Sequence, residues 1–231
     1  MLMKIQLNQV NKNYGKEDIF SINEFEFKTN IINGIIGDNG SGKTTLLRML
    51  SGLDRSYNGD ILYNGRLYAD SLIKDITYIS QKPYMLKRSV FENLAYPLKI
   101  RGYSKDSIEG KVKTFLKKFG IEQLRNREAE VLSAGERQKV ALARGIIFEP
   151  KLLLLDEPTA NIDPETVEFL EEILMEYQQG TEVNIILVTH NINQAMRVCK
   201  QVSLLKDRNL VACSQNYVMK SVGEKTKLHM F

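Results

Sequence analysis

The chain opens with an alternation of apolar and polar residues that predicts a half-buried β-strand. Its apolar positions are Ile5, Leu7 and Val10. Residues 151–155 and 183–188 are different, because they are almost continuously apolar, as parallel strands covered on both faces are. Similar patterns predict strands at 25–27 and 31–36, and short strands within 59–80 around the hairpin signal Asn64-Gly65. Apolar residues at helical spacing predict helices at 43–50, 134–148, 164–178 and 191–199. The described pattern ends with a predicted closing hairpin at 202–213.

The periodicity changes between residues 89 and 127, where apolar residues recur at helical spacing and strand signals are absent. Val90, Leu94 and Leu98 form one such series. We therefore predict a single α/β domain of 231 residues with a mostly parallel core sheet. In this interpretation a helical subdomain at about 89–127 is inserted into a core made of residues 1–88 and 128–231.

A glycine-rich segment after the predicted strand at 31–36 carries the strongest chemical signal. Its sequence, Gly37-Asp38-Asn39-Gly40-Ser41-Gly42-Lys43-Thr44, fits the pattern G-x-x-x-x-G-K-[ST] in full. Glycines let the backbone approach phosphates, and the following helix directs unpaired N–H groups and its dipole at the same anion. In this pattern Lys43 reaches the β- and γ-phosphates and the Thr44 hydroxyl is a ligand for Mg²⁺. The segment predicts a loop that binds ATP.

Polar residues follow three further predicted strands. Asp156 and Glu157 follow one apolar strand, His190 follows a second and Gln81 follows a third. The carboxyl ends of parallel strands line the ligand crevice of such a sheet. We expect Asp156 to hold Mg²⁺, Glu157 to be the base that polarises the attacking water, and His190 to contact the γ-phosphate. Taken alone, each of these residues is more often an ordinary surface or turn residue, and the phosphate loop reverses that preference.

The composition narrows the class of protein. Hydrophobic residues make up 43% and charged residues 26% of the chain, as in ordinary globular proteins. The formal net charge of +4 is a mild excess of interspersed charges, so we expect no nucleic-acid partner. No apolar run approaches the ~20 residues that a bilayer span requires. We therefore expect a cytoplasmic chain whose role at a membrane depends on a partner.

A second motif, Leu132-Ser133-Ala134-Gly135-Glu136, stands at the start of the predicted helix at 134–148 and is followed by Arg137-Gln138. It is similar to LSGGQ, the signature sequence of ABC transporter ATP-binding subunits, which other P-loop proteins lack. The whole chain resembles that family in the order of its motifs, which runs from Tyr14 of the adenine-stacking segment through the phosphate loop, Gln81, the signature, the Asp156-Glu157 pair and Asp163 to His190.

The resemblance implies a P-loop ATPase fold with an N-terminal antiparallel β subdomain, a mostly parallel core sheet and the inserted helical subdomain. It also implies a homodimer that closes on ATP head to tail, with the signature of one copy facing the phosphate loop of the other. The implied nucleotide-binding residues are Tyr14, Gly37, Asp38, Asn39, Gly40, Ser41, Gly42, Lys43, Thr44, Thr45, Ser133, Gly135, Glu136 and Asp163. The implied catalytic residues are Glu157, His190 and Gln81, and the implied Mg²⁺ ligands are Thr44, Gln81 and Asp156.

Two positions depart from the signature of the family. Ala134 replaces its first glycine, which is harmless where the backbone φ is negative and costly where φ is positive. Glu136 replaces glutamine and would place a carboxylate near the nucleotide. We expect Glu136 to tune affinity or rate without abolishing activity.

The resemblance favours the motor of an importer, on the cytoplasmic face of the membrane, with separate transmembrane permease subunits and an extracytoplasmic solute-binding protein. Most apolar residues of the segment 81–98 are expected to belong to the core of the helical subdomain, and some of them to form an exposed groove for the permease. The segment 84–102 is similar to the ATPases of tungstate and related oxyanion importers, although amino-acid import and the export of lipids or peptides stay open.

The alternative class is an ABC ATPase without a channel. The DNA-repair type carries a long coiled coil between the phosphate loop and the signature, and this chain has no sustained heptads there. The translation type carries two cassettes, whereas this chain has one. Cofactor assembly is therefore the alternative that length and motifs leave open.

Overall fold

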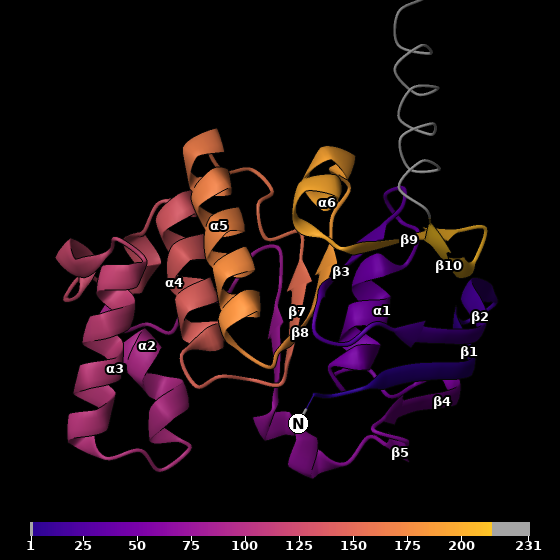
Figure 1. Cartoon of the computed structure of the whole chain (residues 1–231), viewed down its shortest axis with the longest axis horizontal. Helices are drawn as coiled ribbons and strands as arrows, with labels where there is room; N and C mark the ends of the chain where they lie inside the picture. Colours follow the sequence, from indigo (N-terminus) through magenta and orange to yellow (C-terminus); the bar gives the residue numbers. More distant parts are fainter. Residues whose placement is uncertain (1, 214–231) are drawn as a thin grey trace, which may run out of the picture.

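The computed structural model of the protein describes residues 2–213, which form two β-sheets and the helices around them (Figure 1). The first sheet is antiparallel, with the order β2-β1-β4-β5. Its strands are β1 (Ile5–Tyr14), β2 (Glu17–Phe27), β4 (Asn58–Tyr63) and β5 (Arg66–Leu67). The second sheet has six strands in the order β10-β9-β3-β8-β7-β6, of which β10 pairs antiparallel with β9 and the other neighbours are parallel. Its strands are β3 (Ile32–Ile36), β6 (Ile76–Ile79), β7 (Leu152–Asp156), β8 (Asn184–Val188), β9 (Gln201–Lys206) and β10 (Asn209–Cys213).

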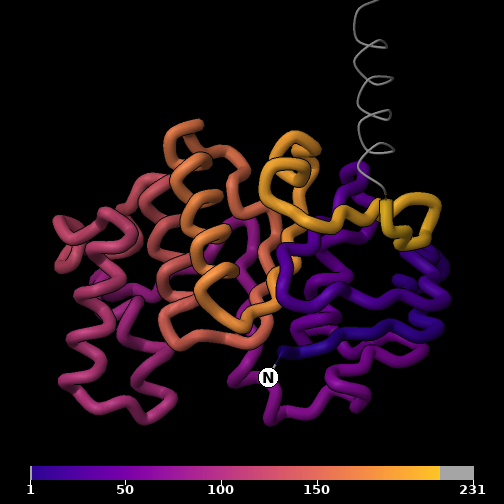
Figure 2. Tube along the Cα trace, viewed as in Figure 1, coloured from indigo at the N-terminus to yellow at the C-terminus, as the bar shows by residue number. Residues whose placement is uncertain are grey.

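Helices cover both faces of the six-stranded sheet. One helix, α1 (Lys43–Leu50), packs between this sheet and the antiparallel sheet. The opposite face is covered by α4 (Ala134–Ile146), α5 (Pro164–Gly180) and α6 (Ile192–Val198). The remaining helices are α2 (Val90–Lys99) and α3 (Lys105–Lys118), at the end of the molecule away from the antiparallel sheet (Figure 2), and the short 3₁₀ helices η1 (Asp70–Lys74), η2 (Glu122–Leu124) and η3 (Ala129–Val131).

The strand β7 explains why its sequence is continuously apolar. Leu153 and Leu155 belong to the hydrophobic core under α4 and α5, whereas Leu152 and Leu154 belong to the core around α1. Successive side chains of a strand point to opposite faces, so both faces of β7 need apolar residues. The predicted fold class, a mostly parallel core sheet with an antiparallel N-terminal sheet, is confirmed.

The first two strands are longer than the hydrophobic pattern predicts. The pairing of β1 with β4 shifts between Asn8 and Asn11, and Gln9 in that interval has a φ of 50°. This bulge moves the inward position from Gln9 to Val10, which interrupts the alternation in the sequence. Beyond it, β1 continues to Tyr14 with mostly polar residues that do not follow the apolar alternation, and these residues stay paired with β2.

The predicted helical segment at 89–127 contains α2 and α3, and α2 packs on α4. Its division from the rest of the chain at residues 88 and 128 stays a prediction. Among residues 2–213, no helix is both long and apolar enough to cross a membrane.

Candidate active site

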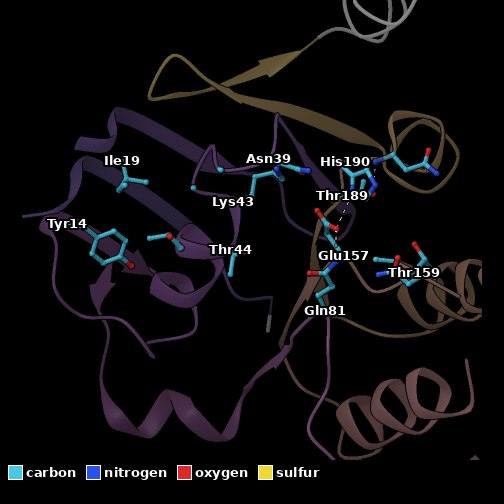
Figure 3. A pocket seen from close by; sticks show the side chains of 16 residues that line it. Tyr14, Ile19, Asn39, Lys43, Thr44, Gln81, Glu157, Thr159, Thr189 and His190 are labelled. Atoms are coloured by element: carbon cyan, nitrogen blue, oxygen red, sulfur yellow. Dashed lines mark hydrogen bonds and ion pairs between the residues drawn. The ribbon is translucent and has the colours of Figure 1, made fainter. Parts of the chain in front are cut away.

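A cavity of about 690 Å³ opens where β3, β6, β7 and β8 end, as expected for the carboxyl ends of parallel strands (Figure 3). Two neighbours that the sequence did not single out, Ile19 and Thr159, also line it. The predicted site residues that line this cavity are Tyr14, Asn39, Gly40, Gly42, Lys43, Thr44, Thr45, Gln81, Glu157 and His190. One cavity is therefore lined by residues as far apart in the sequence as Tyr14 and His190.

Lys43 is held inside the phosphate loop. It is the first residue of α1, only 6% of it is exposed, and its Nζ donates to the carbonyl oxygens of Gly37 and Asp38 at 2.9 and 2.8 Å. Burial lowers the pKa of Lys43, and the nearby carboxylates of Glu157, Asp156 and Asp38 oppose that shift. The loop thus keeps an ammonium group at the start of a helix, where phosphates bind.

Two glycines of the loop are required by its surroundings. A Cβ on Gly37 would lie 2.5 Å from the backbone oxygen of Leu205, which is too close for any side chain. Gly42 has a φ of 96°, and a Cβ there would lie 2.7 Å from Ile19. The motif glycines therefore let the loop pass close to β9 and β2 and still turn into α1.

Asp156, the last residue of β7, points at the start of α1. Its Oδ1 accepts a hydrogen bond from the Thr44 hydroxyl at 3.1 Å, and its Oδ2 accepts one from the Tyr78 hydroxyl at 3.0 Å. Burial raises the pKa of Asp156, while these two hydrogen bonds act in the opposite direction. Adjacent carboxylate and hydroxyl oxygens are the hard ligands that Mg²⁺ prefers, so this pair fits the ion that the sequence predicts.

Tyr78 was not among the predicted site residues. It lies in β6 opposite Leu154 of β7, and that register brings its hydroxyl to Asp156. The signal available in the sequence was a tyrosine within a predicted strand of the core sheet, whose hydroxyl needs a hydrogen-bond partner where it is buried. Its identity as the partner of Asp156 depends on strand register, which the sequence does not reveal.

Glu157 is the meeting point of the three predicted catalytic residues (Figure 3). Its Oε2 lies 3.0 Å from Nδ1 of His190 and accepts a hydrogen bond from Nε2 of Gln81 at 3.2 Å. The backbone of Glu157 has a φ of 45°, a conformation that costs about 1–3 kcal/mol for a residue other than glycine. Glu157 thereby lines the cavity, whereas the buried carboxylate of its neighbour Asp156 lies on the Thr44 and Tyr78 hydroxyls.

The predicted residues of the signature lie elsewhere, at the beginning of α4. Ser133 Oγ accepts from the backbone N–H of Glu136 at 3.2 Å, and Glu136 Oε2 accepts from the backbone N–H of Ser133 at 2.8 Å. This reciprocal pair is a capping box, and the S-x-x-E pattern in the sequence was the signal for it. The Glu136 carboxylate is therefore folded back on its own helix, 3.7 Å from Arg127, and not directed at the cavity.

Asp163 also acts as a helix cap in this structure. Its Oδ1 accepts from the backbone N–H of Thr166 at 2.8 Å at the start of α5. A Cβ on Gly135 would lie 3.2 Å from Oδ2 of Asp163, so this signature glycine allows α4 and α5 to approach. Ala134 is the first residue of α4, where φ is negative, so its replacement of glycine is the harmless case. The fold groups Ser133, Gly135 and Asp163 together, apart from the cavity.

A hydrogen-bonded network centred on the buried residues Gln194 and Glu171 was also not predicted. Gln194 of α6 is 1% exposed, and its Nε2 donates to Thr159 Oγ1 at 2.7 Å and to Glu171 Oε1 at 3.1 Å. Arg197 donates to both carboxylate oxygens of Glu171, at 3.0 and 2.8 Å. The network ties α6, which begins just after His190, to α5 and to the segment after Glu157.

Comparison with known proteins places this arrangement in a family. A model of the ABC transporter family matches residues 21–160, which include the phosphate loop, Gln81, the signature and the Asp156-Glu157 pair. The chain belongs to the ABC transporter family. The resemblance found in the sequence is thereby confirmed, and as an ABC transporter ATP-binding subunit the chain binds ATP and hydrolyses it for transport.

Individual relatives of this ABC subunit differ in how much of their length it spans. It is 44% identical over 204 residues to the ATP-binding protein of a tungstate uptake system from Peptoclostridium acidaminophilum, covering 88% of this chain and 95% of that protein. It is 34% identical over 211 residues to a methionine import ATP-binding protein of Clostridioides difficile, covering 88% of this chain but 66% of that protein. The solved structure of cbiO1 from Clostridium perfringens, part of the ABC transporter complex cbiONQ, superimposes with a TM-score of 0.83 at 28% identity, covering 98% of this chain and 95% of that one.

Proposed function

We propose that the chain is the motor subunit of an importer for tungstate or a related oxyanion. The observation that carries this proposal is the identity of 44% to the tungstate uptake protein, of whose length the chain covers 95%. The methionine import relatives are less similar, and the chain covers only 66% of the one from Clostridioides difficile. Tungstate is therefore the better-supported substrate and methionine the second candidate.

The chemistry that we propose centres on Glu157. Its carboxylate accepts a proton from a water molecule whose oxygen attacks the γ-phosphorus of ATP, and the bond to the ADP oxygen breaks. Gln81 and His190 hold that carboxylate in place, and their distances of 3.2 and 3.0 Å support this role. Lys43 and the N-terminus of α1 bind the β- and γ-phosphates and stabilise the charge that develops on them.

Mg²⁺ is part of the proposal, with Thr44 and Asp156 as its ligands together with the predicted Gln81. The hydrogen bond between Thr44 and Asp156 already brings two oxygen ligands together. The ion supplies positive charge next to the phosphates when it is bound with the nucleotide. Tyr78 keeps Asp156 oriented from the opposite side.

We also propose that two copies of the chain enclose the nucleotide. Ser133 is exposed, its hydroxyl proton is free to be donated while its oxygen caps α4, and Gly135 and Asp163 lie beside it. A helix N-terminus of this kind attracts a phosphate. In this arrangement, Ser133 of one copy completes the phosphate site of the other, and ATP stabilises the closed dimer.

The permease would dock on a second cavity, of about 460 Å³, between β6, α2 and α4. Exposed apolar side chains surround it, with Tyr84 at 70%, Tyr96 at 43% and Ile100 at 62% exposure. Tyr84 and Tyr96 of its lining belong to residues 81–98, the segment for which the sequence predicts a groove. A transmembrane partner at this place would hold the chain on the cytoplasmic face of the membrane.

Purification of the tagged chain from native membranes, followed by reconstitution in liposomes, tests the proposal. We expect permease subunits and a solute-binding protein to co-purify, and tungstate to stimulate ATP hydrolysis while methionine does not. Stimulation by methionine would correct the substrate and leave the motor function standing. Co-purification of soluble scaffold proteins without a permease would favour cofactor assembly and overturn the importer.

A further inference from the structure

A lysine occupies an inward position of β1. The inward side chains of this strand are apolar up to Val10, and the next inward residue is Lys12, whose side chain is only 2% exposed. Its Nζ lies 3.0 and 2.9 Å from the two carboxylate oxygens of Asp54 and donates to the backbone oxygen of Ser56 at 2.6 Å. All three donors of the ammonium group therefore have acceptors within the protein.

This buried ion pair also contacts Tyr14 from two directions. The Lys12 ammonium lies over the ring at 4.6 Å from its centroid, and the Tyr14 hydroxyl donates to Asp54 Oδ2 at 3.3 Å. Burial raises the pKa of Asp54, but the hydrogen bonds from Lys12 and Ser56 outweigh it and lower the pKa overall. Asp54 therefore remains a carboxylate that can accept the bond from Tyr14.

Stability alone does not explain the pair. Burying two charges costs about as much as their attraction returns, and apolar residues of similar volume are often as stable. The pair does restrict an aromatic side chain that is 53% exposed and would otherwise change rotamers at the rim of the cavity. Lys12 and Tyr14 are two residues apart on β1. The pairing of β1 with β2 shifts between Lys12 and Asn13, so an irregularity of the strand lies between the buried lysine and the exposed tyrosine.

We propose that Lys12 and Asp54 are positioning residues that hold the Tyr14 ring as a fixed platform for the base of the nucleotide. The ammonium lies over one face of the ring, and Tyr14 keeps 53% of its surface exposed at the cavity, where a base could stack. This inference rests on the adenine-stacking role that the family resemblance implies for Tyr14. Tyr14 lies across the cavity from Glu157 (Figure 3), so the pair affects nucleotide affinity and not the chemical step.

The test is the double variant Lys12→Met/Asp54→Asn, which removes both charges without leaving either one buried and unpaired. Calorimetry measures its dissociation constants for Mg-ADP and for tripolyphosphate, which has no base to stack. We expect the constant for ADP to rise about two- to fivefold, the range that a cation–π contact accounts for. The constant for tripolyphosphate should stay the same, and KM for ATP should rise while kcat at saturating ATP does not change. Equal losses for both ligands would indicate a general structural effect and overturn the proposal.

The variant Tyr14→Ala tests the role of Tyr14 in nucleotide binding separately from the role of Lys12 and Asp54. Unchanged ADP affinity in Tyr14→Ala would remove Tyr14 as the platform. Weaker affinity in Tyr14→Ala together with unchanged affinity in Lys12→Met/Asp54→Asn would keep the platform and remove the positioning role. In a Tyr14→Ala background, the two charge substitutions should weaken ADP binding no further.

Two more variants guard against misfolding. Lys4→Met/Glu26→Gln removes an exposed ion pair of the same sheet, with its atoms 3.0 Å apart, and should leave both constants unchanged. Tyr14→Phe removes only the hydroxyl contact with Asp54 on an exposed ring and should fold normally. We expect Tyr14→Phe to weaken ADP binding about two- to fivefold, as loss of one hydrogen bond does, and unchanged affinity would overturn the role of Asp54.

Discussion

The phosphate loop and the signature are both glycine-containing turns that lead into a helix, yet the fold treats them differently. Lys43 of the loop donates to two carbonyl oxygens and faces a cavity that also contains Glu157. Ser133 of the signature is exposed and lies outside that cavity, where it caps its own helix. The loop side has its chemical partners within the same chain, whereas the signature side presents a finished helix end to the outside. This difference is what a site shared between two copies would require.

The largest expected effect on ATP hydrolysis comes from substitution of Glu157, in the cavity beside the phosphate loop. Glu157→Gln removes the base but retains the hydrogen-bonding shape, so ATP hydrolysis should fall by about 10²–10⁴ while ATP binding persists. Steady-state ATPase rates and equilibrium binding measure the two properties separately. Glu168→Gln, on an exposed position of α5, is the control and should hydrolyse ATP normally. Full hydrolysis by Glu157→Gln would mean that another group is the base.

Substitutions in the signature should weaken ATP-dependent dimerisation and leave ATP binding by a single copy unchanged. Ser133→Ala, in a Glu157→Gln background, should weaken the ATP-dependent dimer about 10- to 100-fold, because a hydrogen bond to a charged phosphate is lost. Sedimentation with and without ATP measures the dimer. Ser89 forms the same capping box with Glu92 at the start of α2, so Ser89→Ala controls for loss of a cap. Equal dimerisation of the two variants would contradict a shared site.

A smaller effect on activity is expected from substitution of Tyr78, whose hydroxyl donates to Asp156 beside the phosphate loop. Tyr78→Phe removes the hydrogen bond to the buried Asp156 and should cost about 1 kcal/mol of unfolding free energy. It should also raise the Mg²⁺ concentration needed for half-maximal ATP hydrolysis, because Asp156 loses one orienting contact. Urea unfolding and a magnesium titration of the ATPase rate measure these effects. A Mg²⁺ requirement equal to that of the wild type would show that Thr44 alone orients Asp156.

The smallest effect should come from the departure in the signature. Ala134→Gly restores the glycine of the family, but Ala134 is already in helical backbone. The substitution should lower the unfolding free energy by at most about 1 kcal/mol, the difference in helix propensity, and leave the ATPase rate unchanged. A clear gain in rate would mean that residue 134 leaves the helical conformation in the closed dimer.

The sequence predicted the phosphate loop well because a contiguous motif contains all of its chemistry. The strand ends that carry Gln81, Glu157 and His190 were also predictable, since β6, β7 and β8 are marked by apolar runs. Tyr78 and Gln194 were not, because each acts on a partner that is distant in the chain and is brought near by strand register or helix packing. Glu136 as a contact to the nucleotide of a second copy stays a prediction; within one copy, the pattern Ser133-x-x-Glu136 forms a capping box.

Gln194 links two parts of the protein that the motifs present as separate. It lies four residues after His190 and donates to Thr159, which follows Glu157 by two positions, while Arg197 fastens the same helix to Glu171. A rotation of α6 large enough to draw His190 away from Glu157 must therefore pull on the segment that leads to Asp163, or break buried hydrogen bonds. In the dimer that we propose, separation of His190 from Glu157 should therefore be coupled to movement of the segment that leads to Asp163. This coupling would link the two proposed nucleotide sites.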